Sequence, residues 1–235
     1  MSDGPETDSD GDLEPTWKDE EKAVAEPADE SGETDAAAAV DIDDAAVRAA
    51  TALRRGDLVV YPTETVYGLA ADALDERAVE RVFETKGRDR SNPLSIAVPD
   101  VAAALEYAAP SDRTRRFMRA FLPGPVTVVC QRRPAVPDVV AAGDDRVGVR
   151  VPDEPTALAL LRRVAPLTAT SANRSGEANA RSVAALDAEV RDAAAVVLDG
   201  GETPGGESTV VDVAADEVIR PGERAAAVRE WLDEH

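Results

Sequence analysis

The segment from Leu58 to Val98, LVVYPTETVYGLAADALDERAVERVFETKGRDRSNPLSIAV, most constrains what this chain can fold into. Its first four residues are all apolar and stop at Pro62, which is typical of a short buried strand. Asp75 can cap a helix in which apolar residues recur at three and four positions from Val79, so that one face is buried. The helix is expected to end near Gly87, before a basic loop and a second strand. This pattern predicts a strand–helix–strand unit, and in open α/β sheets ligands bind outside the carboxyl ends of the strands.

Helical and strand patterns alternate along the rest of the chain, with no internal repeat. Helices are expected at 41–55, 101–107, 111–122, 154–164, 182–190 and 225–232, and strands at 126–131, 147–151, 167–170, 195–198, 210–213 and 218–220. Such alternation predicts one α/β domain in which a twisted, open, mixed or parallel sheet carries helices on its faces.

The first residues differ from the rest in composition. Of the formal charge of −21, residues 1–35 contribute −12, from fourteen acidic residues against Lys18 and Lys22. This segment has little apolar periodicity, so we expect residues 1–38 to form a disordered acidic tail and residues 39–235 to form the folded domain. The start lacks the basic and apolar regions of a signal peptide, and no apolar run is long enough for a membrane span, which together predict a cytoplasmic protein.

The balance of charged and reactive residues excludes several function classes. Only three lysines occur against 23 arginines, and acids exceed bases throughout, a composition like that of proteins from organisms with molar cytoplasmic salt. The acidic excess also disfavours strong non-specific binding of nucleic acid. The single cysteine, Cys130, lies in an apolar run, and the single histidine is the terminal His235. Disulfides, a zinc framework and histidine-based catalysis are therefore not expected, and no metal ligands are assigned.

Two polar clusters remain as candidate chemistry. Lys86, Arg88 and Arg90 supply cations in the loop after the first helix, which suits a polyphosphate ligand, although an ordinary basic patch at a helix C-terminus fits them equally well. Ser171 and Asn173 directly follow a strand and can present a hydroxyl and an amide, but this pattern alone is more often a turn than a site.

Seven segments in order are similar to the YrdC-like family, the threonylcarbamoyl-AMP synthases. They are YPTETVYGL, KGRDRSNPL, PGPVTV, VGVRVP, TSANRSG, GGESTVVD and IRPG, covering residues 45–222. The resemblance implies a single YrdC-like α/β domain with a large concave, relatively positive cavity. It also implies an ATP-dependent reaction, with Mg²⁺, that joins L-threonine and bicarbonate into threonylcarbamoyl-AMP and releases pyrophosphate. That product supplies the modification of the adenosine beside certain tRNA anticodons.

The resemblance also implies roles for individual residues. Four are expected at the nucleotide phosphates and the reaction centre: Lys86, Arg88, Ser171 and Asn173. Further nucleotide contacts fall on Asn92, Asn179 and Arg220, and threonine contacts on Thr65, Arg150 and Ser208. The chain departs from the family pattern at Ala97, where a histidine is common, and at 178–181, where Pro-Ser-Pro-Thr is common.

Three functions fit these observations. The first is the synthase, whose adenylate is passed to the tRNA threonylcarbamoyl transferase complex. The second is an RNA-binding or ribosome-maturation module of the same fold, and the third is a related carbamoyl-adenylate enzyme with a different acceptor. Release of pyrophosphate that requires both threonine and bicarbonate separates the first from the other two.

Removal of residues 1–38 is expected to leave turnover unchanged, because this acidic segment is assigned only a solvating role. The rate of pyrophosphate release by the shortened and full-length chains checks this expectation. A large loss of turnover in the shortened chain would assign the segment a functional role.

Overall fold

The computed structural model describes the backbone of residues 31–235, with side chains from residue 42 onward. Most of the acidic segment, residues 1–30, lies outside the described residues. The elements in chain order are α1 (Ser31–Arg54), β1 (Leu58–Tyr61), β2 (Gly68–Ala70), α2 (Glu76–Lys86), β3 (Ser95–Ala97), α3 (Val101–Ala104), α4 (Asp112–Phe121), β4 (Val126–Gln131), α5 (Asp138–Ala141), β5 (Arg146–Arg150), α6 (Pro155–Leu161), β6 (Leu167–Ser171), the 3₁₀ turn η1 (Val183–Ala185), α7 (Ala188–Ala193), β7 (Ala194–Val197), β8 (Thr209–Asp212), β9 (Glu217–Arg220) and α8 (Ala225–Glu234).

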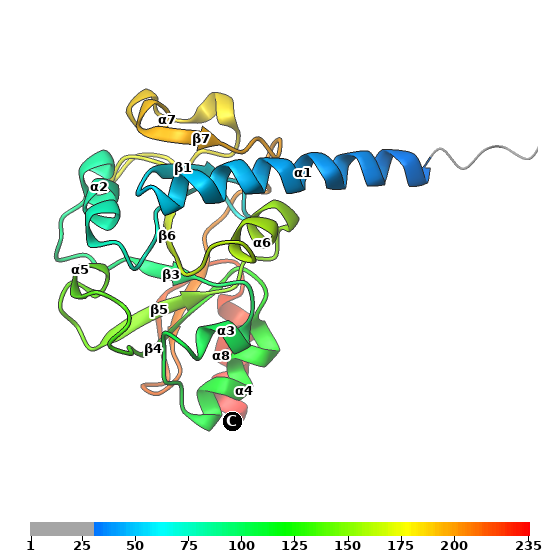
Figure 1. Ribbon diagram of the computed structural model, residues 1–235. Helices are drawn as coiled ribbons and strands as arrows, with labels where there is room; N and C mark the ends of the chain where they lie inside the picture. Colours follow the sequence, from blue (N-terminus) through cyan, green and yellow to red (C-terminus); the bar gives the residue numbers. More distant parts are fainter. Residues whose placement is uncertain (1–30) are drawn as a thin grey trace, which may run out of the picture.

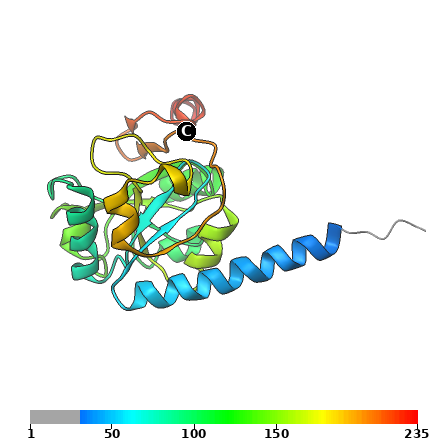
Figure 2. The ribbon, with the colours of Figure 1, turned by 90° about the horizontal axis from the view of Figure 1, so that it is seen from above.

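The nine strands form one mixed sheet, as the alternating pattern predicted. Their order is β7-β1-β2-β6-β3-β5-β4-β8-β9. The pairs β1–β7, β3–β5 and β4–β8 are parallel, whereas the five other pairs are antiparallel. Figures 1 and 2 both place α1 near the β7–β1 end of this sheet and α8 near the β8–β9 end.

The first strand shows why the chain buries both faces of the sheet. Leu58 and Val60 belong to the larger apolar cluster, which includes residues of α2 and α4. Val59 and Tyr61 belong to a second cluster with residues of α1 and α6. Because neighbouring strand residues point to opposite faces, an uninterrupted apolar run is what a doubly covered strand requires.

The helix α2 begins and ends as expected. The Asp75 side chain accepts hydrogen bonds from the backbone N–H groups of Arg77 and Ala78, and Gly87 ends the helix in the left-handed region, at φ 57°. Glycine adopts this conformation without the steric penalty of a side chain. The buried face includes Val79, as its spacing predicted.

Two predictions about local structure were wrong, and two short elements were missed. α1 begins at Ser31 instead of residue 41, so residues 31–38 are helical; the alanine run 36–39 has the highest helix propensity. The helix expected at 182–190 is split, because Asp187 caps a new helix, α7, after η1. The short elements β2 and α5 were not expected, since three or four residues carry no readable periodicity.

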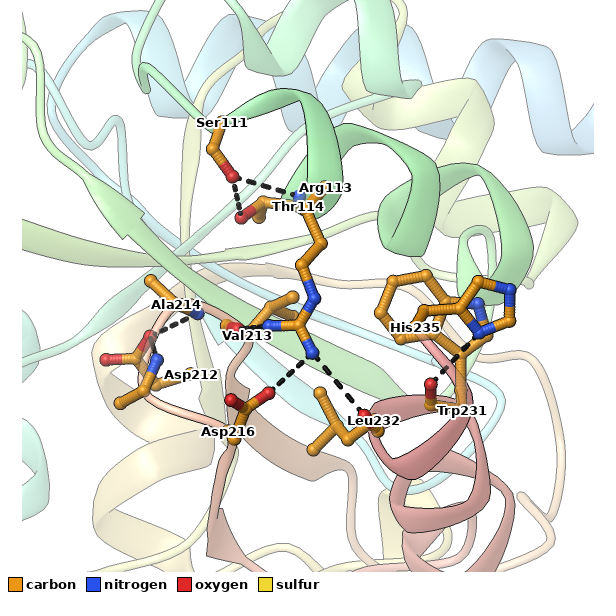
Figure 3. A network of polar contacts seen from close by, with 11 residues as sticks. Ser111, Arg113, Thr114, Asp212, Val213, Ala214, Asp216, Trp231, Leu232 and His235 are labelled. Carbon is orange, nitrogen blue, oxygen red and sulfur yellow. Dashed lines mark hydrogen bonds and ion pairs between the residues drawn. The ribbon is translucent and has the colours of Figure 1, made fainter.

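A polar cluster anchors the C-terminal helix and the β8–β9 turn to α4 (Figure 3). The Arg113 guanidinium donates to the carbonyls of Val213, at 2.5 Å, and Leu232, at 3.5 Å, and pairs with Asp216 at 2.5 Å. It also lies 5.7 Å from the centre of the Trp231 ring, whose edge meets Phe117. One side chain therefore joins three elements. None of the helices within residues 31–235 is both long and apolar enough to cross a bilayer.

Replacing Arg113 with methionine is expected to lower the free energy of unfolding by about 2 kcal/mol, because charged hydrogen bonds to two elements are lost while the aliphatic stem is kept. Urea unfolding measures the change. Arg116→Met, at an exposed position of the same helix, is the matched control and should change stability little. Equal effects of the two substitutions would contradict the anchoring role of Arg113.

Candidate active site

A cavity of about 420 Å³ lies along the sheet, lined by residues of β1, β3, β4, β5, β6, β8 and β9 and of the loops between them. Its charged lining consists of Arg88, Arg146, Arg150 and Arg220 against Asp144 and Glu207. Cations therefore exceed acids inside this cavity, in a chain whose formal charge is −21. Such a local reversal of charge favours an anionic ligand.

The cavity extends further than the strand-end rule predicted. Both the first residue of β5, Arg146, and its last, Arg150, line it, as does Gly148 between them. Alternate residues of a strand share one face, so the whole length of β5 forms the floor. The cavity therefore reaches along the strands as well as to their carboxyl ends.

Lys86 and Ser171 come together, as the two predicted polar clusters required. The Lys86 ammonium donates to the backbone carbonyls of Ser171 and Asn173, each at 2.5 Å, and lies 3.4 Å from Asn173 Oδ1. Lys86 is 2% exposed, and neither it nor Asn173 lines the cavity, whereas Ser171 does. The three polar contacts of the Lys86 ammonium are all to the segment that carries Ser171.

Two further contacts stiffen that segment. The Ser171 hydroxyl donates to Asn173 Oδ1, and Asn173 Nδ2 donates to the carbonyls of Arg174 and Glu177, at 2.8 and 2.7 Å. Burial, and secondarily the neighbouring Arg88 guanidinium, lowers the pKa of Lys86 to about 8. The loop after β6 is therefore held by a buried ammonium that lies outside the cavity lining. Its lowered pKa means that it loses its proton at a lower pH than an exposed lysine does.

The basic loop after α2 directs one of its two arginines into the cavity. Arg88 lines the cavity and donates to the carbonyls of Asn92, at 3.1 Å, and Pro93, at 2.9 Å. Burial and the nearby Arg220 guanidinium lower the pKa of Arg88. Two guanidiniums kept close to each other are stabilised by an anion between them. Arg90 is different, because it pairs with Glu80 at 2.5 Å on α2 and is absent from the cavity lining.

Arg150 and Thr65 form a second group in the cavity. The Arg150 guanidinium donates to Thr65 Oγ1 at 3.0 Å and pairs with Glu64 at 3.0 Å. The side chains of Arg150 and Glu64 are only 14% and 13% exposed. Thr65 Oγ1 also lies 3.0 Å from Thr63 Oγ1. This group can bind a carboxylate beside a hydroxyl.

Arg220 and Ser208 meet at the β8–β9 side of the cavity. Arg220 donates to the Ser208 hydroxyl and to its carbonyl, both at 2.9 Å, and the hydroxyl lies 3.2 Å from Thr127 Oγ1. Asn179 and Ala97 also line the cavity. Of the ten predicted site residues, only Lys86 and Asn173 are outside the lining, and both lie directly behind Ser171.

Sequence reasoning missed two charged residues. Glu64 holds Arg150, and its place within PTET was the available signal. Arg146 lines the cavity and pairs with the buried Asp212 at 2.7 Å. The alternation of Arg146, Gly148 and Arg150 along one strand could have revealed it. Among the side chains that the structure describes, from residue 42 onward, no group of three or more acidic, histidine or cysteine residues is arranged to hold a metal ion.

Comparisons with known proteins agree on one family. The sequence model of the Sua5, YciO and YrdC family, described as "Telomere recombination", matches residues 51–222. A threonylcarbamoyl-AMP synthase of Pyrococcus abyssi is 41% identical over 180 residues, which are 74% of this chain and 53% of that protein. The human threonylcarbamoyl-AMP synthase is 34% identical over 192 residues, covering 75% of this chain and 67% of the human protein.

Solved structures give the same result. The crystal structure of P. abyssi Sua5 complexed with L-threonine superposes with a TM-score of 0.68 at 39% identity, covering 78% of this chain and 54% of that one. The chain therefore spans about half the length of its P. abyssi relative. Residues 51–222, which match the family model, include every residue that lines the cavity.

The Lys86 amine is expected to titrate near pH 8, because burial disfavours its charged form. NMR of selectively labelled lysine side chains can follow this, since the chain has only three lysines. The signal with the low midpoint should disappear in Lys86→Met. A midpoint for Lys86 at or above 10 would show that the ammonium is not desolvated.

Proposed function

This chain belongs to the Sua5, YciO and YrdC family, and on that premise we propose that it is a threonylcarbamoyl-AMP synthase. It converts L-threonine, bicarbonate and ATP into threonylcarbamoyl-AMP and pyrophosphate. The observation that carries this proposal is a single cavity that joins a pair of guanidiniums, Arg88 and Arg220, to a carboxylate-binding group at Arg150 and Thr65. One end suits phosphates, and the other suits an amino acid.

We assign the amino acid to the Arg150 end. The guanidinium of Arg150 binds the threonine carboxylate, which makes charge-assisted hydrogen bonds roughly twice as strong as neutral ones. The hydroxyl of Thr65, already 3.0 Å from Arg150, orients the same group. Ser208 closes this region from the β8 side. A relative from P. abyssi, Sua5, has been crystallised with L-threonine, which supports this substrate.

We assign the nucleotide to the Arg88 end. Arg88 and Arg220 neutralise the phosphates, and the Ser171 hydroxyl together with Asn92 and Asn179 supplies neutral hydrogen bonds around them. Lys86 and Asn173 lie outside the cavity lining and act indirectly, by fixing the backbone that presents Ser171. The positive charge that this end needs is thus provided by arginines, which stay charged across the physiological range.

The reaction then rests on positioning and electrostatics. The threonine amine combines with bicarbonate to give a carbamate and water, and a carbamate oxygen attacks the α-phosphorus of ATP. The bond from this phosphorus to the bridging oxygen breaks, and its electron pair leaves with pyrophosphate. Arg88 and Arg220 stabilise the charge that develops on the leaving group. No histidine lines the cavity, so we assign no general base of neutral pKa among its residues.

Mg²⁺ enters this scheme with the nucleotide. The cavity carboxylates are both beside arginines, Asp144 at 3.6 Å from Arg146 and Glu207 at 4.0 Å from Arg220. The described residues therefore offer no free carboxylate pair that would fit a resident cation. Mg²⁺ keeps several waters and is commonly held by substrate phosphates, so we propose that it is carried by ATP and helps to neutralise its charge.

The product determines the partner. Threonylcarbamoyl-AMP is a mixed anhydride that water destroys, so its consumption requires a rapid transfer to the tRNA adenosine. We propose a hand-off to the tRNA threonylcarbamoyl transferase complex in the cytoplasm, where tRNA and ATP are both present.

Pyrophosphate release should require ATP, L-threonine and bicarbonate together, and Arg88→Ala should lower kcat/KM at least a hundredfold because a phosphate-facing charge is lost. Arg90→Ala is the matched control, since it removes an arginine from the same loop but outside the cavity, and it should keep wild-type kinetics. A coupled pyrophosphate assay measures both variants.

Release of pyrophosphate without threonine, or with other amino acids equally well, would contradict the assigned substrate. Equal losses in Arg88→Ala and Arg90→Ala would contradict the assigned phosphate end.

A further inference from the structure

The connection from β7 to β8 crosses most of the sheet. These strands follow each other in the chain, yet β1, β2, β6, β3, β5 and β4 lie between them. Residues 198–208, here called the strap, make this crossing (orange in Figure 2). The last three strap residues, Gly206, Glu207 and Ser208, line the cavity. The position of the strap therefore decides where Ser208 stands relative to the amino-acid end.

The beginning of the strap is held by one phenol. Tyr67 Oη donates to the Gly201 carbonyl at 2.8 Å, accepts from the Gly200 N–H at 3.0 Å and lies 3.2 Å from Asp199 Oδ1. The tyrosine is fully buried, and burial raises the pKa of its hydroxyl, which keeps the donor proton in place. Gly200 also packs so closely on Pro62 that an added Cβ would lie 2.7 Å from Pro62 Cγ.

The end of the strap is held by residues 65–67, the same segment that contains Tyr67. The Gly205 N–H donates to the Thr65 carbonyl at 2.8 Å, and Gly205 and Gly206 have φ values of +93° and +88°, which glycine adopts freely. Thr65 uses its hydroxyl for Arg150 and its carbonyl for the strap. Residues 65–67 thus couple the amino-acid end of the cavity to the segment that carries Ser208.

We propose that Tyr67 is a positioning residue for the amino-acid substrate: its hydroxyl fixes the strap that brings Ser208 to the wall of the cavity shared with Arg150 and Thr65. This inference rests on the proposed function for its substrate. Tyr67 is among the residues that line the cavity, but its hydroxyl contacts Asp199, Gly200 and Gly201, so we assign its action to the strap and not to the reacting atoms.

Tyr67→Phe is the direct test, since it removes one oxygen and keeps the buried ring. The Kd for L-threonine, measured by calorimetry, and the KM for L-threonine should each rise about tenfold. The KM for ATP should change less than the threonine KM, although Ser208 also contacts Arg220, and kcat should likewise change less than the threonine KM. Hydrogen–deuterium exchange of residues 198–206 should accelerate. The matched control is Tyr107→Phe, because Tyr107 Oη donates at 3.3 Å to the Ala165 carbonyl and is absent from the cavity lining; it should change none of these quantities.

A second variant tests the same proposal if Tyr67→Phe does not fold. Asp199 is exposed, and its Oδ1 accepts from the Gly201 N–H and lies 3.2 Å from Tyr67 Oη, so Asp199→Ala should shift the threonine KM and strap exchange in the same direction by a smaller factor. Wild-type threonine affinity and strap exchange in both variants would overturn the proposal, as would a proportional loss of affinity for ATP and threonine. Loss of the proposed function is a separate result, seen as no pyrophosphate from the wild-type chain, and strap exchange still tests Tyr67 in that case.

Discussion

The burial of one ammonium organises this cavity. Lys86 lies at the end of α2 and reaches the carbonyls of Ser171 and Asn173 at the end of β6, so that two segments far apart in the sequence are held at 2.5 Å contacts. A buried charge is costly unless hydrogen-bond acceptors surround it, and here carbonyl oxygens take that role. The same contacts fix the direction of the Ser171 side chain. Any nucleotide contact made by the β6 loop therefore depends on a lysine that does not itself line the cavity.

In this arrangement the lysine and the arginines have different roles: the lysine holds the backbone, and the arginines supply positive charge to the cavity. The lysine is desolvated, and its pKa of about 8 makes it a poor source of constant charge. The arginines that line the cavity keep their charge even when partly buried and close to one another. An acidic chain can in this way keep a cation-rich cavity, because four guanidiniums are concentrated where only two carboxylates are present. The field that a ligand meets is set by the cavity lining and much less by the formal charge of −21.

Much of the fold could be predicted from the sequence, and the features that were predicted correctly share a cause. The strand 58–61, the Asp75 cap and the Gly87 stop are local features, each decided by a few neighbouring residues. The family segments led us to expect ten site residues, and eight of these line the cavity. The failures were of two kinds. Elements of three or four residues, such as β2 and α5, are formed by tertiary contacts and not by their own pattern. The roles of Glu64 and Arg146 depend on pairing with Arg150 and Asp212, which the sequence does not place beside them.

Strand order is the property that joins these observations. The motif around Thr65 lies between β1 and β2, Arg150 ends β5 and Ser208 precedes β8, so this part of the cavity draws on three parts of the sheet. Hydrogen bonds of the 65–67 turn reach both of the others, through the Thr65 hydroxyl to Arg150 and through its carbonyl to Gly205. A turn with this many partners has little freedom to change without moving the cavity wall. The geometry of the site is consequently a property of how distant strands are tied together, and the polar side chains that tie them matter as much as those that face the ligand.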